Sequence, residues 1–292
     1  MMVGAAEINS YIHNVIQAQT RGFMIRSLRT LAILTAILAS MAACTGTGSR
    51  ESNIQLLGNA EGFPGRKVAA GTLDTTFNET GIVTMDGVAT ITSSVQVAAQ
   101  KDGGVVLSGT TLVEGKYRIV AARFRADGSF DPSFGVAGRL TLAIPGRENT
   151  EARTMKIQPD GKIIIGGYSY LGKLTSNRAA MLVRLLPTGT LDSTFGSGGI
   201  VLTSQLSGGA TWCVDIALAD DGKIVMSGNV SPNNRRTDLM IARFHSNGSL
   251  DASFGTNGMT LTSIGEGHAR ISAVLLQPDG KIVVAGSYAH AT

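Results

Sequence analysis

Carboxylates on the segments that differ between repeated parts of the sequence are the first candidates for chemistry. Hydrolysis of a glycosidic bond needs an acid and a base, which two carboxyl groups about 5–10 Å apart can supply. The sequence offers four such groups, Glu148, Glu151, Asp215 and Glu266, spread over different repeats. We therefore expect a protein that is not an enzyme, with an envelope glycan hydrolase or lyase as the alternative. Two of the four groups within that distance at the centre of the molecule would favour an enzyme.

A recurring pattern of arginine and aspartate raises a second hypothesis, a ring of cations. Three arginines each stand eight residues before an aspartate: Arg123 before Asp131, Arg184 before Asp192 and Arg243 before Asp251. A buried guanidinium needs carboxylate or carbonyl partners. We therefore expect structural ion pairs at the junctions between repeats, not a functional ring.

The aspartate-rich turns also suggest calcium, which needs several oxygen ligands at close spacing. Thr188 and Asn247 stand where another copy has Asp127, so turn chemistry explains these positions better. The four histidines show no ligand spacing, and no glycine-rich segment follows a strand and opens a helix. We expect no metal, no cofactor and no catalytic residue.

Cys44 ends a segment that is typical of a secretory signal. Beginning at Met24, two arginines precede an apolar run over 31–38 and then small residues. The apolar run is shorter than the roughly 20 residues that cross a bilayer. The last four residues, Met41 to Cys44, resemble a bacterial lipobox, although the family usually has Leu at the position of Met41. The resemblance implies that the Cys44 thiol is acylated and that Cys44 becomes the new N-terminus.

The lipobox resemblance also implies a location in the cell. Acyl chains contribute about 0.8 kcal/mol per buried CH₂, so more than one chain anchors a protein durably. In bacterial lipoproteins an Asp directly after the acylated cysteine keeps the protein from the outer membrane. This chain has Thr45 at that position, which implies an outer-membrane lipoprotein on the periplasmic or cell-surface side. We expect a leader over 1–43, whose true start is Met24, and a lipidated flexible tether over 44–66.

Composition and charge restrict the classes of partner that the protein could bind. The 292 residues carry a formal net charge of +4, and no basic run after the leader is longer than the two residues of Arg235-Arg236. That balance does not build a nucleic-acid surface. The second cysteine, Cys213, is expected to be a small buried thiol.

The elements that would position these residues are internal repeats with a period near sixty. Asp-Gly turns recur at Asp102, Asp160, Asp221 and Asp279, which are 58, 61 and 58 residues apart. Phenylalanines recur in step with them at Phe77, Phe134, Phe195 and Phe254. Repetition at a fixed period indicates one structural unit per repeat.

Each unit contains four short strand signals. In the unit that begins at Arg139 they cover 139–142, 152–158, 162–167 and 179–186. Asp-Gly between alternating apolar segments is a strong hairpin signal, and four antiparallel strands per repeat are typical of a propeller blade. The sequence predicts an all-β β-propeller of about four blades over 67–292.

The paired motifs DGS(L/F)DxSFG and QPDGKI(I/V) resemble the delta-60 repeat, a family of bacterial β-propeller repeats. The resemblance covers about residues 67–292 and departs from the pattern at 101–104 and 220–221. The family describes an architecture, so the resemblance implies no catalytic residues.

An antiparallel unit of this kind has two unlike edges. The Asp-Gly turns and the DGSLDxSFG links fall on one edge, and the connections that vary between copies fall on the other. Function usually resides on loops that a rigid scaffold holds. We therefore expect a binding face on the variable edge, with ten candidates: Arg147, Tyr168, Tyr170, Arg178, Trp212, Asn233, Arg235, Arg236, His268 and Arg270.

Closure of the propeller stays open at this point. The segment NAEGFPGRKV is a poor strand because of Gly62, Pro64 and Gly65, which leaves either an imperfectly closed disc or an open arc with exposed strand edges. We expect a lipid-anchored, non-enzymatic binding or scaffold module that meets an envelope protein or glycan. A purely structural envelope protein is the further alternative.

Overall fold

The computed structural model describes residues 55–57, 72–84, 91–172, 177–203, 209–232 and 236–290. The chain divides into two compact units, Met1–Arg50 and Glu51–Thr292, and every described residue belongs to the second. The leader, Cys44 and the segment NAEGFPGRKV lie outside the described residues. Within the described ranges, no helix is long and apolar enough to cross a membrane.

The described unit is all-β. Its first strands are β1 (Gln55–Leu57), β2 (Ile82–Thr84), β3 (Ile91–Ala99), β4 (Val105–Val113), β5 (Lys116–Phe124), β6 (Arg139–Leu142), β7 (Asn149–Ile157) and β8 (Ile163–Tyr170). The later ones are β9 (Ala179–Leu185), β10 (Ile200–Leu202), β11 (Ala210–Leu218), β12 (Ile224–Ser231), β13 (Asp238–Phe244), β14 (Met259–Thr262), β15 (His268–Leu276) and β16 (Ile282–Ala289).

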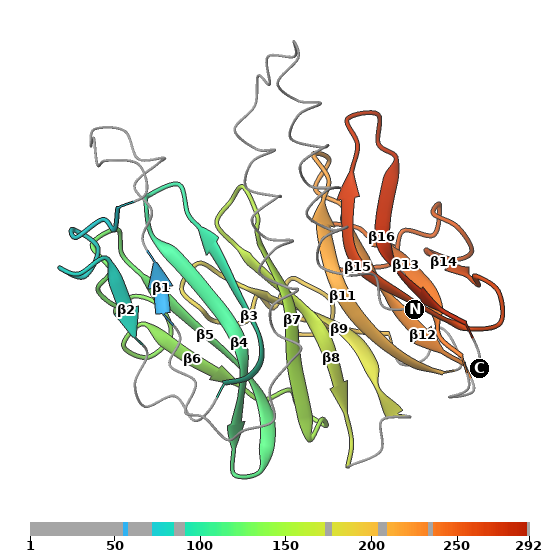
Figure 1. The fold of residues 1–292 in the computed structure, drawn as a ribbon, viewed down its shortest axis with the longest axis horizontal. Coiled ribbons are helices and arrows are strands. Elements are labelled where there is room, and N and C mark those ends of the chain that lie inside the picture. Colours follow the sequence, from blue (N-terminus) through green and yellow to red (C-terminus); the bar gives the residue numbers. More distant parts are fainter. Residues whose placement is uncertain are drawn as a thin grey trace, which may run out of the picture. The chain divides into compact units, whose positions relative to one another are not determined.

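These strands form successive antiparallel sheets (Figure 1). Three sheets have four strands, in the orders β3-β4-β5-β6, β7-β8-β9-β10 and β11-β12-β13-β14. Two further sheets have two strands each, β1-β2 and β15-β16. The first strand of each sheet contacts the first strand of the next, β3 with β7, β7 with β11 and β11 with β15. The predicted β-propeller fold is confirmed, in an open form.

The boundary between blades differs from the prediction. The sequence assigned Arg139–Leu142 to the start of a new unit, but this strand, β6, is the fourth strand of the preceding sheet and pairs with β5 through Ala122 and Arg139. The DGSFDPSFG link folds back on its own sheet, because Arg123 exchanges backbone hydrogen bonds with Asp131 and Gly138. The link therefore joins the third and fourth strands of one blade, and does not lead to the next.

The predicted Asp-Gly hairpins are present. At the turn between β7 and β8, Gly161 has a φ of +83°, and Asp160 Oδ1 accepts a hydrogen bond of 3.1 Å from the backbone N–H of Lys162. Asp221 and Asp279 accept the same bond from the lysine two residues on. Side chains of aspartate that bond the backbone two residues later stabilise such turns.

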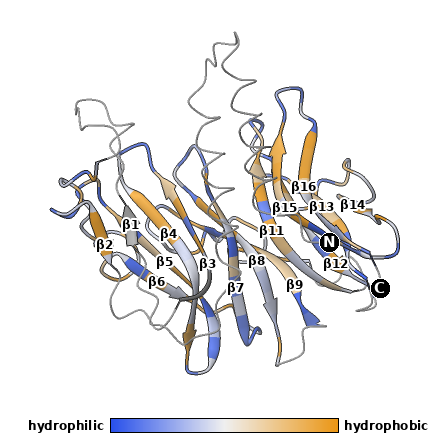
Figure 2. Cartoon of the chain, viewed as in Figure 1, coloured by the Kyte–Doolittle hydropathy of each residue, from blue (hydrophilic) through white to orange (hydrophobic). Residues whose placement is uncertain are grey.

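The core lies between consecutive sheets. Every residue of β8 and β12 is buried, and the glycines and serines of these strands are buried together with the isoleucines and valines. Ile164 on β8 and Ile216 on β11 are both fully buried in one hydrophobic cluster. Figure 2 shows hydrophobic residues on strands of every sheet, as expected for blades that cover one another.

Two of the recurring phenylalanines lie at the junctions between sheets. Phe134 and Phe195 are fully buried. The residue after each one donates a backbone hydrogen bond to the link of the next sheet, Gly135 to Thr188 and Gly196 to Asn247. One repeated motif therefore both closes its own blade and joins it to its neighbour.

Candidate functional site

Antiparallel pairing gives the propeller two edges with different chemistry, as the sequence predicted. We call the edge that carries the Asp-Gly turns and the DGSLDxSFG links (125–138, 186–199 and 245–258) the constant edge. The variable edge is the opposite one, with the connections β6–β7, β8–β9, β10–β11, β12–β13 and β14–β15. A charged ligand could bind where charged side chains are not already paired within the protein, so the charged residues of the two edges are compared below.

On the constant edge, the recurring arginines form the ion pairs that the sequence predicted. Arg184 Nε lies 2.8 Å from Asp192 Oδ2, and the two side chains are only 5% and 4% exposed. The guanidinium stacks over Phe195 at 4.4 Å and donates a short hydrogen bond to the carbonyl of Ser246 in the next sheet. The buried Arg184 guanidinium is therefore paired within the protein and is not available to a ligand.

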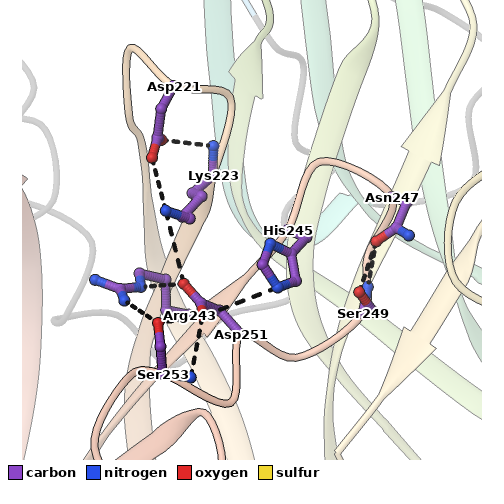
Figure 3. A network of polar contacts seen from close by, with 8 residues as sticks. All are labelled: Asp221, Lys223, Arg243, His245, Asn247, Ser249, Asp251 and Ser253. Carbon is purple, nitrogen blue, oxygen red and sulfur yellow. Dashed lines mark hydrogen bonds and ion pairs between the residues drawn. The ribbon is translucent and has the colours of Figure 1, made fainter.

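The third copy of this network shows how completely its polar atoms are engaged (Figure 3). Arg243 Nε lies 2.8 Å from Asp251 Oδ2, and Lys223 Nζ lies 3.8 Å from the same oxygen. Asp251 Oδ1 accepts hydrogen bonds from the hydroxyl and backbone N–H of Ser253, at 2.6 and 3.1 Å. The constant edge is therefore a structural seam.

Hydrogen bonding also sets the acidity of these carboxyls. The Thr194 hydroxyl, which donates to Asp192, lowers the pKa of that carboxyl to about 2, and Arg184 and Lys162 assist. The Ser253 hydroxyl does the same for Asp251, whose pKa is also about 2. Both carboxyls are thus fixed as anions at neutral pH and do not act as general acids there.

On the variable edge, the sheet β7–β10 gathers five side chains into what we call the Glu151 cluster. Its members are Glu151 and Arg153 on β7, Tyr168 and Tyr170 on β8, and Arg178 just before β9. The Tyr168 hydroxyl donates to Glu151 Oε2 at 2.6 Å, and the Tyr170 hydroxyl donates to Oε1 at 3.2 Å. Both carboxylate oxygens therefore have a phenol partner.

Two arginines enclose the aromatic pair. Arg178 stacks over the Tyr168 ring at 4.7 Å and over the Tyr170 ring at 5.9 Å. Arg153 donates from Nη2 to the Tyr168 hydroxyl at 3.0 Å, and the same nitrogen lies 3.9 Å from Glu151 Oε2. Cation–π stacking and charge-assisted hydrogen bonds hold these long side chains in one geometry.

The local fold explains why these residues meet. Glu151 and Tyr168 face each other directly across β7 and β8, and the bulge between Ala152 and Thr154 places Arg153 beside them. Tyr168 and Tyr170 are two residues apart, so they share one face of β8. Burial, followed by the nearby Glu151 charge, raises the pKa of Tyr170, and burial raises the pKa of Tyr168. The phenols act as fixed hydrogen-bond donors.

Three of the predicted binding residues, Tyr168, Tyr170 and Arg178, are thus brought together. The two tyrosines are 2% and 8% exposed, so they shape the site and do not project from it. Arg153 was absent from the predicted set. The signal that could have found it is the bulge, which the sequence does not display.

Other predicted binding residues lie on other sheets. Trp212 is half-buried on β11 opposite Asn229, and Arg270 is exposed on β15 opposite Ser287. Arg236 pairs with Asp238 at 3.2 Å, and His268 Nδ1 lies 3.1 Å from the Thr237 hydroxyl.

Arg147 is half-buried before β7, within the connection from β6. Asn233 and Arg235, like Cys44, lie outside the described residues. The predicted face therefore consists of one cluster and several separate positions.

Three of the four carboxylates that could serve an enzyme have structural partners, and the fourth, Glu266, is exposed in the connection before β15. Glu148 accepts a hydrogen bond of 2.8 Å from the backbone N–H of Gly172, and Glu151 is held by the two tyrosines. Asp215 on β11 accepts from Thr154 on β7 and from the backbone N–H of Val274 on β15, at 2.9 and 3.0 Å. In the described ranges, no group of three or more His, Cys, Asp or Glu residues could hold a metal.

Cys213 on β11 is fully buried, as the sequence predicted. Burial, and secondarily the charge of Asp215, raises the pKa of the Cys213 thiol. A buried thiol with a raised pKa is a poor nucleophile.

Comparison with known proteins supports a propeller-repeat family. Residues 100–134, 158–195, 219–254 and 277–291 match the family model described as domain of unknown function (DUF5122) beta-propeller. No curated protein matches the chain. Among solved structures, a candidate glycoside hydrolase from Parabacteroides distasonis ATCC 8503 is similar with a TM-score of 0.36 and 15% identity. The match covers 66% of each chain, so this chain spans just under two thirds of that protein.

Proposed function

We propose that the protein is a lipid-anchored binding or scaffold module of the bacterial cell envelope, built from repeats of the delta-60 type. The observation that carries the proposal is the difference between the two edges. The constant edge uses its arginines and aspartates to join blades, whereas the variable edge differs from blade to blade. A repeat protein that keeps one edge constant and varies the other presents the variable edge to partners.

The Glu151 cluster gives the proposed face a rigid centre. Tyrosine and arginine are enriched among the residues that dominate binding energy, because they offer large contact areas and directed hydrogen bonds. Arg178 is half-buried over the two tyrosine rings, and 39% of the Arg153 side chain is exposed. A ligand on this edge would meet guanidinium groups whose positions are already fixed, which reduces the entropy cost of binding.

The carboxylates favour binding over catalysis in this proposal. A glycosidase needs one carboxyl group that can donate a proton and a second that can attack or activate water. Three of the four candidates, Glu148, Glu151 and Asp215, are each engaged by backbone or side-chain donors. Only Glu266 remains exposed, and a glycosidase needs two carboxyl groups. We therefore propose that the variable edge binds an envelope protein or glycan and does not cleave it.

Membrane anchoring is tested through Cys44, which supplies the acylation site in the proposal. Cys44→Ala in the full chain should move the protein from the membrane fraction to the soluble periplasmic fraction. A Cys213→Ala variant is the matched control and should stay with the membrane. Retention of the Cys44→Ala protein in the membrane fraction would contradict the anchor.

The binding face is tested by affinity capture from envelope extracts with two charge-matched variants. Arg178→Glu with Arg236→Glu reverses two charges on the variable edge. Arg125→Glu with Lys281→Glu reverses two exposed charges on the constant edge, where the side chains are 54% and 74% exposed. We expect the first pair to reduce capture at least tenfold and the second to leave it unchanged. Equal losses, or release of cleaved glycan fragments, would overturn the proposal.

A further inference from the structure

The repeats provide an internal comparison for the Glu151 cluster, because its position also occurs in the sheets before and after it. Tyr168 on β8 corresponds to Thr110 on β4 and to Asn229 on β12, since each is paired with the same position of the first strand of its sheet. All three side chains are at most 2% exposed. Each must therefore satisfy its polar atoms inside the protein.

In the neighbouring sheets, this position ties one blade to the next. The Thr110 hydroxyl accepts a hydrogen bond of 3.0 Å from the backbone N–H of Ala152 on β7. The side-chain oxygen of Asn229 accepts from the backbone N–H of Ile271 on β15 at 3.3 Å, and its amide donates to the carbonyl of Ala269 at 2.9 Å. Neutral side chains are therefore enough to hold these junctions.

Tyr168 departs from this arrangement. Its hydroxyl donates to Glu151 and accepts from Arg153, which both belong to its own sheet. Among the described residues, the Tyr168 hydroxyl makes no hydrogen bond to the next sheet. The side chain therefore holds the cluster together where its counterparts hold the blades together.

The charged members of the cluster have uncharged counterparts in the sheet β11–β14. The positions of Glu151, Arg153 and Arg178 are held there by Trp212, Val214 and Thr237. That sheet forms the same junction without charge at these three positions. The fold therefore does not require the charges of the Glu151 cluster, which leaves them available for a ligand.

Within the cluster, the carboxylate is bonded mainly by the phenols and not by the guanidinium groups. The two tyrosine hydroxyls lie 2.6 and 3.2 Å from the Glu151 oxygens, whereas the Arg153 nitrogen lies 3.9 Å away. Arg178 stacks on the two rings, and its buried Nε has no hydrogen-bond partner. A buried guanidinium needs carboxylate or carbonyl partners. With two arginines and one glutamate, the cluster has one positive charge in excess.

We propose that the Glu151 cluster binds a carboxylate group of an acidic glycan, an inference that names the ligand class for the binding role proposed above and rests on that role. A carboxylate carries the single negative charge that balances the cluster. Planar guanidinium groups bind carboxylates through two parallel N–H···O bonds. The phenols of Tyr168 and Tyr170 keep Glu151 occupied, so its own carboxylate does not compete for the arginines.

The exposed part of the cluster favours a glycan over a protein as the source of the carboxylate. A protein partner gains most from aromatic and apolar anchors at the centre of an interface. Tyr168 and Tyr170 are 2% and 8% exposed, so their rings lie too deep to serve as anchors. The cluster instead exposes guanidinium, with 39% of the Arg153 side chain open. Such donors suit the carboxylates of a hydrophilic chain.

The experiment measures the affinity of the full-length Cys44→Ser chain for short oligogalacturonate and oligoglucuronate by titration calorimetry. Methyl-esterified oligogalacturonate is the matched ligand, because it keeps the sugar chain and removes the charge. We expect the ester to bind about tenfold more weakly or less. Arg178→Gln and Arg153→Gln should each weaken binding of the acids by a similar factor, since each removes one partner of a charge pair.

Arg125→Gln is the matched control variant, because it removes one exposed positive charge from the constant edge and should leave the affinity unchanged. The urea midpoint of each variant shows whether it is folded. Arg178→Lys keeps the charge and loses the planar fork, so it should bind more weakly than the wild type and more tightly than Arg178→Gln.

Three results would overturn the inference. They are equal binding of the acid and its ester, tighter binding of polyglutamate than of either acidic oligosaccharide, and no binding of either oligosaccharide. The capture experiment on envelope extracts separates this failure from that of the proposed function. If capture still depends on the variable edge while the oligosaccharides do not bind, the ligand class is wrong and the binding role stands.

Discussion

Gly189 lies directly against the ring of Phe134, across the junction between two blades. A Cβ atom on Gly189 would stand 3.0 Å from Phe134 Cε2 and from the backbone nitrogen of Gly135. Gly189 also has a φ of +83°, which L side chains rarely adopt. The relationship recurs between Gly248 and Phe195, so the glycine of each DGS link is required by the preceding blade as well as by its own turn.

Gly189→Ala should therefore destabilise the junction by more than the cost of its backbone conformation. Gly161→Ala is the matched control, because Gly161 has the same φ of +83° but meets only Pro187 at 3.4 Å. Overpacking typically costs about 1–3 kcal/mol. We expect the free energy of unfolding in urea to fall by about that much more for Gly189→Ala than for Gly161→Ala. Equal losses would show that the turn alone requires the glycine.

Asp192→Asn should be one of the most destabilising conservative changes on the constant edge. It leaves the Arg184 guanidinium, 5% exposed, without its carboxylate partner. Removing one partner of a buried pair costs about 3–5 kcal/mol. Asp131→Asn is the control, because its pair with Arg123 is more exposed, at 17% and 13%, and should cost less. Urea unfolding followed by circular dichroism measures both, and a larger loss for Asp131→Asn would contradict the burial argument.

Acid should weaken the blade junctions in a defined pH range. The folded-state pKa of Asp192 is about 2, below an unfolded value near 3.8, mainly because the Thr194 hydroxyl donates to the carboxylate. The unfolded chain therefore binds a proton first as the pH falls, and the stabilisation is present above about pH 4 and lost towards pH 2. Asp251 contributes in the same direction.

The measurement is the urea midpoint at pH 5, 4, 3 and 2. We expect a progressive fall below pH 4 and a shallower fall for Asp192→Asn, which has no proton to bind at that position. Identical pH profiles for the wild type and the variant would show that Asp192 does not contribute.

Cys213 should be inert in the folded protein. Its side chain is fully buried and burial raises the pKa of its thiol, so the thiolate is scarce at pH 8. In the Cys44→Ser chain, we expect iodoacetamide to label Cys213 at least a hundredfold more slowly than in 6 M urea, as measured by intact mass. Rapid labelling of the native protein would mean that β11 opens locally.

Short-range patterns made much of this fold predictable from sequence. The period near sixty, the Asp-Gly hairpins and the pairing of Arg184 with Asp192 all depend on residues within one repeat. Glu151, Trp212 and Arg270 hold equivalent positions on β7, β11 and β15, because strands in successive blades keep one register.

The binding cluster was only partly visible in the sequence. Tyr168 and Tyr170 stand two residues apart, so a shared face of one strand could be inferred. Their partners could not, because Glu151 is seventeen residues earlier and the bulge that brings in Arg153 leaves no sequence signature. Burial of both tyrosines depends on tertiary packing, which the sequence of one strand does not specify.

The sequence by itself determined the unit and its two edges, because turn geometry and strand alternation are local properties of the chain. The tertiary structure alone decided where one blade ends. Arg139–Leu142 could pair with the strand before it or the strand after it, and the backbone hydrogen bonds of Arg123 with Asp131 and Gly138 select the former. The division of strands between blades therefore depends on pairing partners that the local sequence does not specify.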